Sequence, residues 1–209
     1  MREWELWALE KGYSCVAGVD EAGRGPLAGP VVAAACILPL DHSIAGIKDS
    51  KQLSAQQRRK VFEAIKNDVS IHYGVGIVEV PDIDRINILQ ASLLAMKIAI
   101  EALSLSPDFV LVDGNKKIPG LQIEQKAIIQ GDALSLSIGA ASIIAKEVRD
   151  AIMLQIHQKW PVYGFDKHKG YATKEHINAI NAHGPCNEHR KSFDPIKSLE
   201  RRKLSLELF

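Results

Sequence analysis

The chain has 209 residues, which suits one domain and is long enough to bury a substantial core. Its hydrophobic fraction of 46% and charged fraction of 24% are ordinary for a soluble globular protein. The formal net charge is only +1, so bulk charge gives no indication of a nucleic-acid partner, although a modest surplus of Lys and Arg follows residue 166.

The hydropathy, the first residues and the cysteines of the chain indicate its cellular location. No apolar stretch is long enough to span a bilayer, and the first residues lack the basic and apolar regions of a secretion signal. The three cysteines are odd in number and form no Cys-x-x-Cys pair, which favours a reducing compartment without a disulfide framework. We therefore expect a cytoplasmic protein without membrane association, and we expect a monomer.

The apolar runs and helix signals predict a mixed α/β fold, with a mixed sheet covered by helices. Ser54 and Gln57 form a capping box that opens one helix. Five apolar residues, spaced four, three, four and three apart from Leu89 to Leu103, form the buried stripe of a longer one. In chain order we expect strands at 14–20 and 30–38, a helix from 54 to about 65, a strand at 71–78, a helix along 89–103, strands at 109–112 and 122–129, a helix at roughly 136–158, and a helix capped by Thr173 that stops at Gly184.

Acidic side chains follow three of the expected strands. Asp20 and Glu21 end the first, Asp113 ends the strand at 109–112, and Asp132 comes shortly after the strand at 122–129. In α/β sheets, ligands gather at the carboxyl ends of the strands, so the three segments can converge. Asp113 alone reads as a turn residue and Asp132 alone as a helix cap. Two adjacent carboxylates beside a core are unfavourable without a cation, which makes metal binding the better interpretation of the set.

Hydrolysis of a phosphodiester would explain both the acids and the loop that follows them. Two divalent ions can activate water and stabilise the leaving oxygen, and Mg²⁺ takes hard oxygen ligands from a few carboxylates. We expect Asp20 to bridge the two ions. Gly23 and Gly25 let a backbone approach a ligand closely, and Arg24 between them suits a phosphate.

Three further patterns leave alternatives open. His183, Cys186 and His189 are spaced like loose zinc ligands, but no fourth ligand is evident. A face of the helix at 136–158 that carries Ser142, Lys146 and Arg149 is either a solvated stripe or a phosphate-contacting surface. Tyr171, in a glycine-containing loop, either packs or stacks on a sugar or base.

An ordered set of motifs over about residues 14–195 resembles the ribonuclease HII family. Each motif is weak alone, and the ordered set is very specific. The segments are Asp20-Glu-Ala-Gly-Arg-Gly25, Asp49-Ser-Lys-Gln-Leu53, Asp113-Gly-Asn115, Gly131-Asp132, Ala140-Ala-Ser-Ile-Ile-Ala-Lys146 with Arg149-Asp150, His168-Lys-Gly-Tyr-Ala-Thr173, and His183-Gly184 with His189-Arg-Lys-Ser-Phe193.

The resemblance implies an RNase H-like fold, with a five-stranded mixed sheet, flanking helices and a C-terminal helical part. It implies one catalytic domain over residues 1–209, with a core at about 14–195 and a helical tail at about 196–209. The implied activity is endonucleolytic: it cuts the RNA strand of RNA–DNA hybrids and nicks 5′ to single ribonucleotides in duplex DNA, leaving 5′-phosphate and 3′-hydroxyl ends.

The resemblance also assigns residues. The metal-binding catalytic positions, for two Mg²⁺ or Mn²⁺ ions, are those of Asp20, Glu21, Asp113 and Asp132. The positions that contact the ribonucleotide 2′-hydroxyl and the adjacent phosphate are those of Gly23, Arg24 and Gly25. Tyr171 takes the position that stacks on the sugar, and Lys51 and Lys146 match positions near the phosphates.

Two departures from the family pattern are small. Gln52 stands where a second lysine is frequent, and Gly139 stands where serine is usual. The short N-terminal stretch and Asp132 as fourth acid favour ribonuclease HII over the related ribonuclease HIII. The alternatives are another nuclease of the same fold, such as a junction resolvase or integrase, and a non-catalytic nucleic-acid-binding module.

Overall fold

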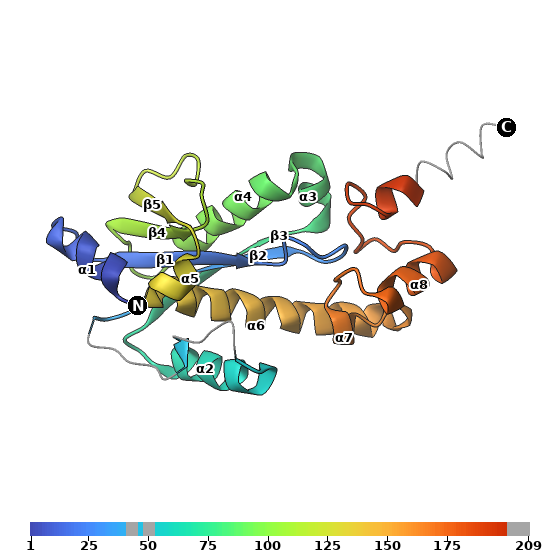
Figure 1. Cartoon of the computed structure of the whole chain (residues 1–209), viewed down its shortest axis with the longest axis horizontal. Coiled ribbons are helices and arrows are strands. Elements are labelled where there is room, and N and C mark those ends of the chain that lie inside the picture. The colour runs from blue at the N-terminus through green and yellow to red at the C-terminus, as the bar shows by residue number, and fades with distance from the viewer. Residues whose placement is uncertain (41–45, 48–52, 200–209) are drawn as a thin grey trace.

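A five-stranded mixed sheet forms the centre of the molecule, as predicted (Figure 1). The computed structural model describes residues 1–40, 46–47 and 53–199. The strands lie in the order β3-β2-β1-β4-β5; β1, β2 and β3 are antiparallel neighbours, and β4 and β5 run parallel to β1. Their bounds are β1 (Val16–Ala22), β2 (Val31–Ile37), β3 (His72–Val78), β4 (Phe109–Asp113) and β5 (Glu124–Ile128).

Helices cover both faces of this sheet (Figure 1). One face packs against α4, and the other packs against α6 with α2 beside it. A smaller apolar cluster joins the end of α6 to the C-terminal elements. The helices that lie wholly within the described residues are α1 (Glu3–Glu10), α2 (Ala55–Asn67), α3 (Val80–Ile86), α4 (Ile88–Glu101), α5 (Gly131–Leu134), α6 (Leu136–Lys159), the 3₁₀ turn η2 (Pro161–Tyr163), α7 (Phe165–His168) and α8 (Lys174–His183). Residues 196–199 are also helical, and the rest of the predicted helical tail lies outside the described residues.

The local signals in the sequence account for several helix ends. The Ser54 hydroxyl accepts a hydrogen bond from the Gln57 backbone N–H, and the Gln57 side chain accepts one from the Ser54 N–H, so the predicted capping box is confirmed. Thr173 caps α8 through the backbone N–H of His176. These caps fix where α2 and α8 begin.

The contact between α6 and β1 depends on the absence of a side chain at Gly18. A Cβ atom at this position would lie 2.2 Å from the backbone nitrogen of Ile138, on the first turn of α6. No flexible side chain could move away to relieve that clash. Glycine therefore lets the helix backbone lie directly on the strand whose end carries Asp20 and Glu21.

The structure adds elements that the sequence patterns did not predict. Helix α1 precedes the first strand, and its Trp7 packs against Phe109 of β4. Helix α3 ends at Ile86, and the next residue, Asn87, has a positive φ of 68° that turns the chain before α4 begins. None of the described helices has the length and apolar character needed to cross a bilayer.

Candidate active site

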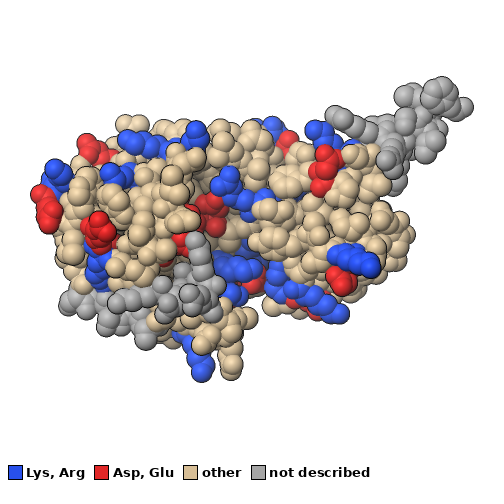
Figure 2. Space-filling model, viewed as in Figure 1, with Lys and Arg blue, Asp and Glu red and all other residues tan. Residues whose placement is uncertain are grey.

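A cleft of about 470 Å³ lies at the carboxyl ends of β1 and β4. Figure 2 shows this face of the molecule hollowed near its middle, with acidic atoms in the hollow and basic atoms beside them. The cleft is therefore a place where charges of both signs meet. Its lining includes Asp20, Glu21, Gly23, Arg24, Gly25, Arg58, Asp113, Asp132, Ser142, Lys146 and Tyr171.

The sheet topology explains how the four acids come together. Because β1 and β4 are parallel neighbours with Val19 opposite Val112, the residues that follow, Asp20 and Asp113, lie next to each other near the carboxyl ends of the two strands. The Asp113 carboxylate accepts a hydrogen bond of 2.7 Å from the backbone N–H of Gly131, which fixes the start of α5 and the place of Asp132. The structure thus brings all four predicted acids to one cleft.

Burial and mutual repulsion govern the protonation of these acids. Asp20 is only 6% exposed, and its pKa lies well above the usual range because of burial first and the nearby charges of Glu21 and Asp113 second. A hydrogen bond from Ser142 and one from the Glu21 N–H partly offset that rise. Burial also raises the pKa of Glu21, against the opposing effect of Arg24 at 3.0 Å.

The four acids form a donor set that suits a hard divalent cation. Four carboxylates supply hard oxygen ligands, and the pKa of Asp20, raised by burial first and by neighbouring negative charge second, marks a carboxylate whose ionised form a cation would stabilise. Glu21, however, bonds Arg24, and Asp113 bonds Gly131. Among the described residues, no group of three or more His, Cys, Asp or Glu is already arranged to hold a metal ion.

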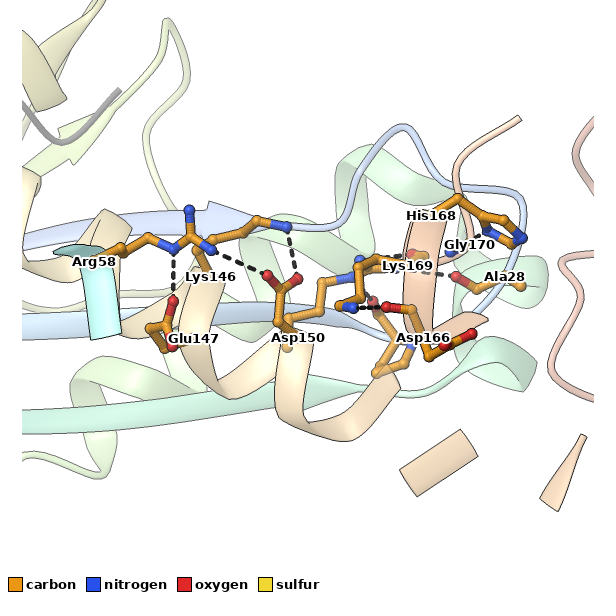
Figure 3. Close-up of polar contacts among 11 residues, drawn as sticks. Ala28, Arg58, Lys146, Glu147, Asp150, Asp166, His168, Lys169 and Gly170 are labelled. Atoms are coloured by element: carbon orange, nitrogen blue, oxygen red, sulfur yellow. Dashed lines mark hydrogen bonds and ion pairs between the residues drawn. The ribbon is translucent and has the colours of Figure 1, made fainter. Parts of the chain in front are cut away.

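A basic side of the cleft lies along α6 and α2 (Figure 3). Lys146 donates to Asp150 at 2.6 Å, one helical turn on. Arg58, from α2, donates to Glu147 at 2.6 Å and to Asp150 at 3.3 Å. No sequence motif predicted Arg58, because its place in the cleft depends on the packing of α2 against α6.

Two buried arginines hold the loop that contains Gly23, Arg24 and Gly25. Arg149 donates to the carbonyls of Ala28 and Pro30 at 3.0 Å each. Arg190 donates to those of Gly23 at 2.6 Å and Arg24 at 3.0 Å. Both side chains are fully buried, and burial lowers their pKa values, that of Arg190 to about 9. The loop shape is thus set from distant parts of the chain.

Tyr171 stands beside this loop. Its side chain is 46% exposed, and a Cβ built on Gly25 would lie 3.8 Å from a carbon of its ring. The Arg149 guanidinium also donates to the carbonyl of Lys169 at 3.1 Å, so one side chain joins the two loops. The predicted contact residue Lys51 lies outside the described residues.

The three candidate zinc ligands, His183, Cys186 and His189, do not all lie together in the structure. The Cys186 sulfur lies 3.2 Å from Nδ1 of His189, but the ring of His183 packs edge-on against Tyr163. The third group beside His189 is His176, at 3.0 Å. His176, His189 and Cys186 form a hydrogen-bonded chain that does not include His183.

Solved structures define the class of protein that has this fold. The ribonuclease H2 of Pyrococcus horikoshii superposes with a TM-score of 0.75 at 28% identity, over 90% of this chain and 98% of that one. Bst-RNase HIII in complex with Mn²⁺ shares the fold with a TM-score of 0.66 at 22% identity, over 90% of this chain and 70% of that one. The fold is that of the RNase H enzymes.

Sequence comparison makes the assignment more specific. A model of the ribonuclease HII family matches residues 17–195. Ribonuclease HII of Chlamydia trachomatis serovar A is 56% identical over 197 residues, which is 93% of this chain and 88% of the relative. That of Chlamydia pneumoniae is 53% identical over 199 residues, 95% and 92% of the two chains. The chain belongs to the ribonuclease HII family, and it is therefore a ribonuclease H, a hydrolase that acts on RNA–DNA hybrids.

Proposed function

We propose that the enzyme also nicks duplex DNA on the 5′ side of single embedded ribonucleotides, leaving 5′-phosphate and 3′-hydroxyl ends. The observation that carries this proposal is the position of the glycine loop and Tyr171 in the same cleft as the four acids. A lone ribonucleotide differs from its neighbours by one 2′-hydroxyl, so the enzyme must recognise that group close to the phosphate it cuts.

The loop has the features that such recognition needs. Without a Cβ, Gly23 and Gly25 leave backbone groups open to a sugar, and the buried Arg190 keeps the loop carbonyls in place. Arg24, half exposed, reaches the adjacent phosphate. The Tyr171 ring then stacks on the neighbouring sugar and sets the strand over the acids.

Hydrolysis requires two divalent ions, Mg²⁺ or Mn²⁺, held by Asp20, Glu21, Asp113 and Asp132. When bound, the ions supply an activated water and stabilise the leaving oxygen. The carboxylates would hold the ions, and Glu21 can offer its Oε2 while its Oε1 accepts from Arg24. Charge crowding at Asp20 and the all-oxygen donor set support this assignment, and a protein of the same fold, Bst-RNase HIII, has been solved with Mn²⁺.

The basic side of the cleft accounts for binding of the duplex backbone. Lys146 and Arg58 are held by the carboxylates of Glu147 and Asp150, which restricts their motion before a phosphate arrives. Lys51 stays a predicted phosphate contact. The three free cysteines are consistent with a reducing compartment, and we place the reaction in the cytoplasm.

The test is cleavage of a labelled DNA duplex that holds one ribonucleotide, with Mg²⁺ or Mn²⁺. We expect one nick on the 5′ side of the ribonucleotide, none in the matched all-deoxy duplex, and cutting of a continuous RNA–DNA hybrid. Equal cutting of the all-deoxy duplex would remove the recognition role of the loop. Cutting of the hybrid alone would confine the enzyme to hybrids.

A further inference from the structure

A chain of buried histidines lies beneath the loop that presents Tyr171. His176 and His189 face each other with their Nε2 atoms 3.0 Å apart, and both are almost fully buried. At one end, Nδ1 of His189 lies 2.9 Å from the backbone nitrogen of Cys186. At the other end, Nδ1 of His176 lies 2.9 Å from the carbonyl oxygen of Tyr171.

The direction of every hydrogen bond in this chain follows from its two ends. The Cys186 N–H can only donate, so Nδ1 of His189 carries no proton and its Nε2 does. That Nε2–H donates to Nε2 of His176, which must then carry its proton on Nδ1. The Nδ1–H of His176 donates to the Tyr171 carbonyl. Both rings are therefore neutral, in opposite tautomers.

His168 holds the loop from the other side. Its Nδ1 accepts a hydrogen bond of 3.2 Å from the backbone N–H of Gly170, and its Nε2–H donates to the Tyr163 carbonyl at 2.7 Å. Its ring stacks on that of His176, with centroids 4.4 Å apart and planes 18° apart. The backbone of Gly170 and Tyr171 thus bonds to two stacked imidazoles.

The loop needs this support because its backbone is unusual. Lys169 has a φ of 51° and Gly170 a φ of 85°. A Cβ on Gly170 would lie 2.6 Å from the Ala28 carbonyl, since the Leu27 N–H donates to Gly170 directly. The position of the Tyr171 backbone is therefore tied to the loop that carries Gly23, Arg24 and Gly25.

We propose that His176, oriented by His189 and Cys186, is a positioning residue that sets the Tyr171 carbonyl and so the angle of the Tyr171 ring over the substrate. The activity part of this proposal rests on the proposed function, in which Tyr171 contacts the sugar. The positioning part rests on geometry alone, so the two are tested separately.

The first test measures the tautomers of the three histidines directly. Long-range ¹⁵N–¹H spectra of the full-length protein at pH 7 should show His176 protonated on Nδ1, and His168 and His189 protonated on Nε2. Hydrogen exchange of the amides of residues 170–173 should speed up in His176→Gln. A different tautomer at His176, or unchanged exchange, would overturn the positioning role whatever the enzyme cuts.

The second test separates positioning from general stability with two matched variants. The Asn amide at position 176 occupies the place of Nδ1 and can still donate to Tyr171, whereas the Gln amide extends to the place of Nε2 and cannot. We expect kcat on the single-ribonucleotide duplex to fall about tenfold or more in His176→Gln, with little change in KM, and His176→Asn to restore most of it. Equal losses of kcat in the two variants would contradict the proposal.

A double-mutant cycle completes the design. Tyr171→Ala keeps the carbonyl that His176 bonds but removes the ring. If His176 acts through that ring, His176→Gln should cost little further activity in the Tyr171→Ala background. The same loss in both backgrounds would show a merely structural effect and overturn the proposal. A silent Tyr171→Ala single variant would instead refute the proposed recognition role of the ring, and the activity part of the positioning role with it.

Discussion

The ionised form of Asp20 is disfavoured in the folded protein. It is buried beside two further carboxylates, and its pKa is raised accordingly. A raised carboxyl pKa means that the folded state binds its proton more tightly than the unfolded state. Stability is therefore lost as the pH rises through the folded pKa, and at neutral pH the charged form opposes folding.

This leads to the first prediction. Asp20→Asn should abolish cleavage, because a site for two divalent ions loses an anionic ligand. It should leave the melting temperature of the metal-free protein equal or higher, because the repulsion is relieved. Asp82→Asn, on an exposed Asp that pairs with Arg85, is the matched control and should change neither activity nor stability by much. Turnover near that of the wild type in Asp20→Asn would remove Asp20 from the catalytic role.

The second prediction concerns removal of the metal. EDTA should stop hydrolysis without unfolding the protein, and added Mg²⁺ or Mn²⁺ should restore it, because carboxylate oxygens suit hard ions. Circular dichroism and a cleavage assay on the same sample would check this. Activity that survives EDTA together with bound stoichiometric zinc would point back to the Cys186 and His189 region.

At the scale of elements, the packing of α6 on the sheet gives the third prediction. Gly18→Ala would place a methyl group 2.2 Å from backbone atoms of α6, so we expect a loss of several kcal/mol or failure to fold. Gly139→Ala is the matched control within α6. Its Cβ would lie 3.1 Å from the side chain of Ile47 and 3.2 Å from the carbonyl oxygen of Asp132, contacts that shifts of a few tenths of an ångström would relieve, and alanine favours helix by about 1 kcal/mol.

Urea unfolding of the two variants and the wild type would measure the difference. Equal free energies of unfolding for Gly18→Ala and Gly139→Ala would show that the close approach of α6 to β1 is unimportant. A large loss in Gly139→Ala alone would show that Ile47 and the backbone of Asp132 cannot move aside.

The elements also show what sequence patterns could and could not reveal. The five strands, the capping box at Ser54 and the gathering of acids at strand ends were predictable, because each follows from periodicity or from the parallel pairing of β1 and β4. Helix α1 was not, because its short sequence is held by contacts between Trp7 and Phe109, far apart in the chain.

The candidate site also has residues that sequence motifs predicted and residues that they did not. Motif order identified the acids, the glycine loop and Tyr171, although their roles stay predictions. The partners that hold them were not visible, because Arg190 bonds Gly23 across 167 positions and His176 meets His189 across 13, with no spacing rule to connect either pair. Arg58 enters the cleft through tertiary packing alone.

At the scale of the whole molecule, the buried histidines make stability depend on pH. The pKa values of His176 and His189 are lowered from 6.5 to about 4, mainly by burial. Their neutral forms contribute stability that is fully present above pH 6.5 and is lost as the pH falls toward 4. The loss should reach up to about 3 kcal/mol for each ring, at 1.36 kcal/mol per pKa unit.

This is the fourth prediction, and urea unfolding at pH 7 and pH 4.5 would measure it. The double variant His176→Asn, His189→Gln should lose less stability between the two pH values than the wild type. His183→Gln, at an exposed histidine, should follow the wild type. A double variant with the full wild-type pH dependence would place the titrating groups elsewhere.

The reach of Arg190 back to the glycine loop also imposes an order on biosynthesis. The carbonyl of Arg24 is made 166 residues before the guanidinium that holds it. At ribosomal speeds of 5–20 residues per second, that interval lasts roughly 10–30 s. All four acids are in the chain before Arg190 is added. Until then, the glycine loop lacks the hydrogen bonds that Arg190 donates to it. The glycine loop of a growing chain therefore cannot take the shape seen in the folded enzyme until the C-terminal segment that carries Arg190 has been made.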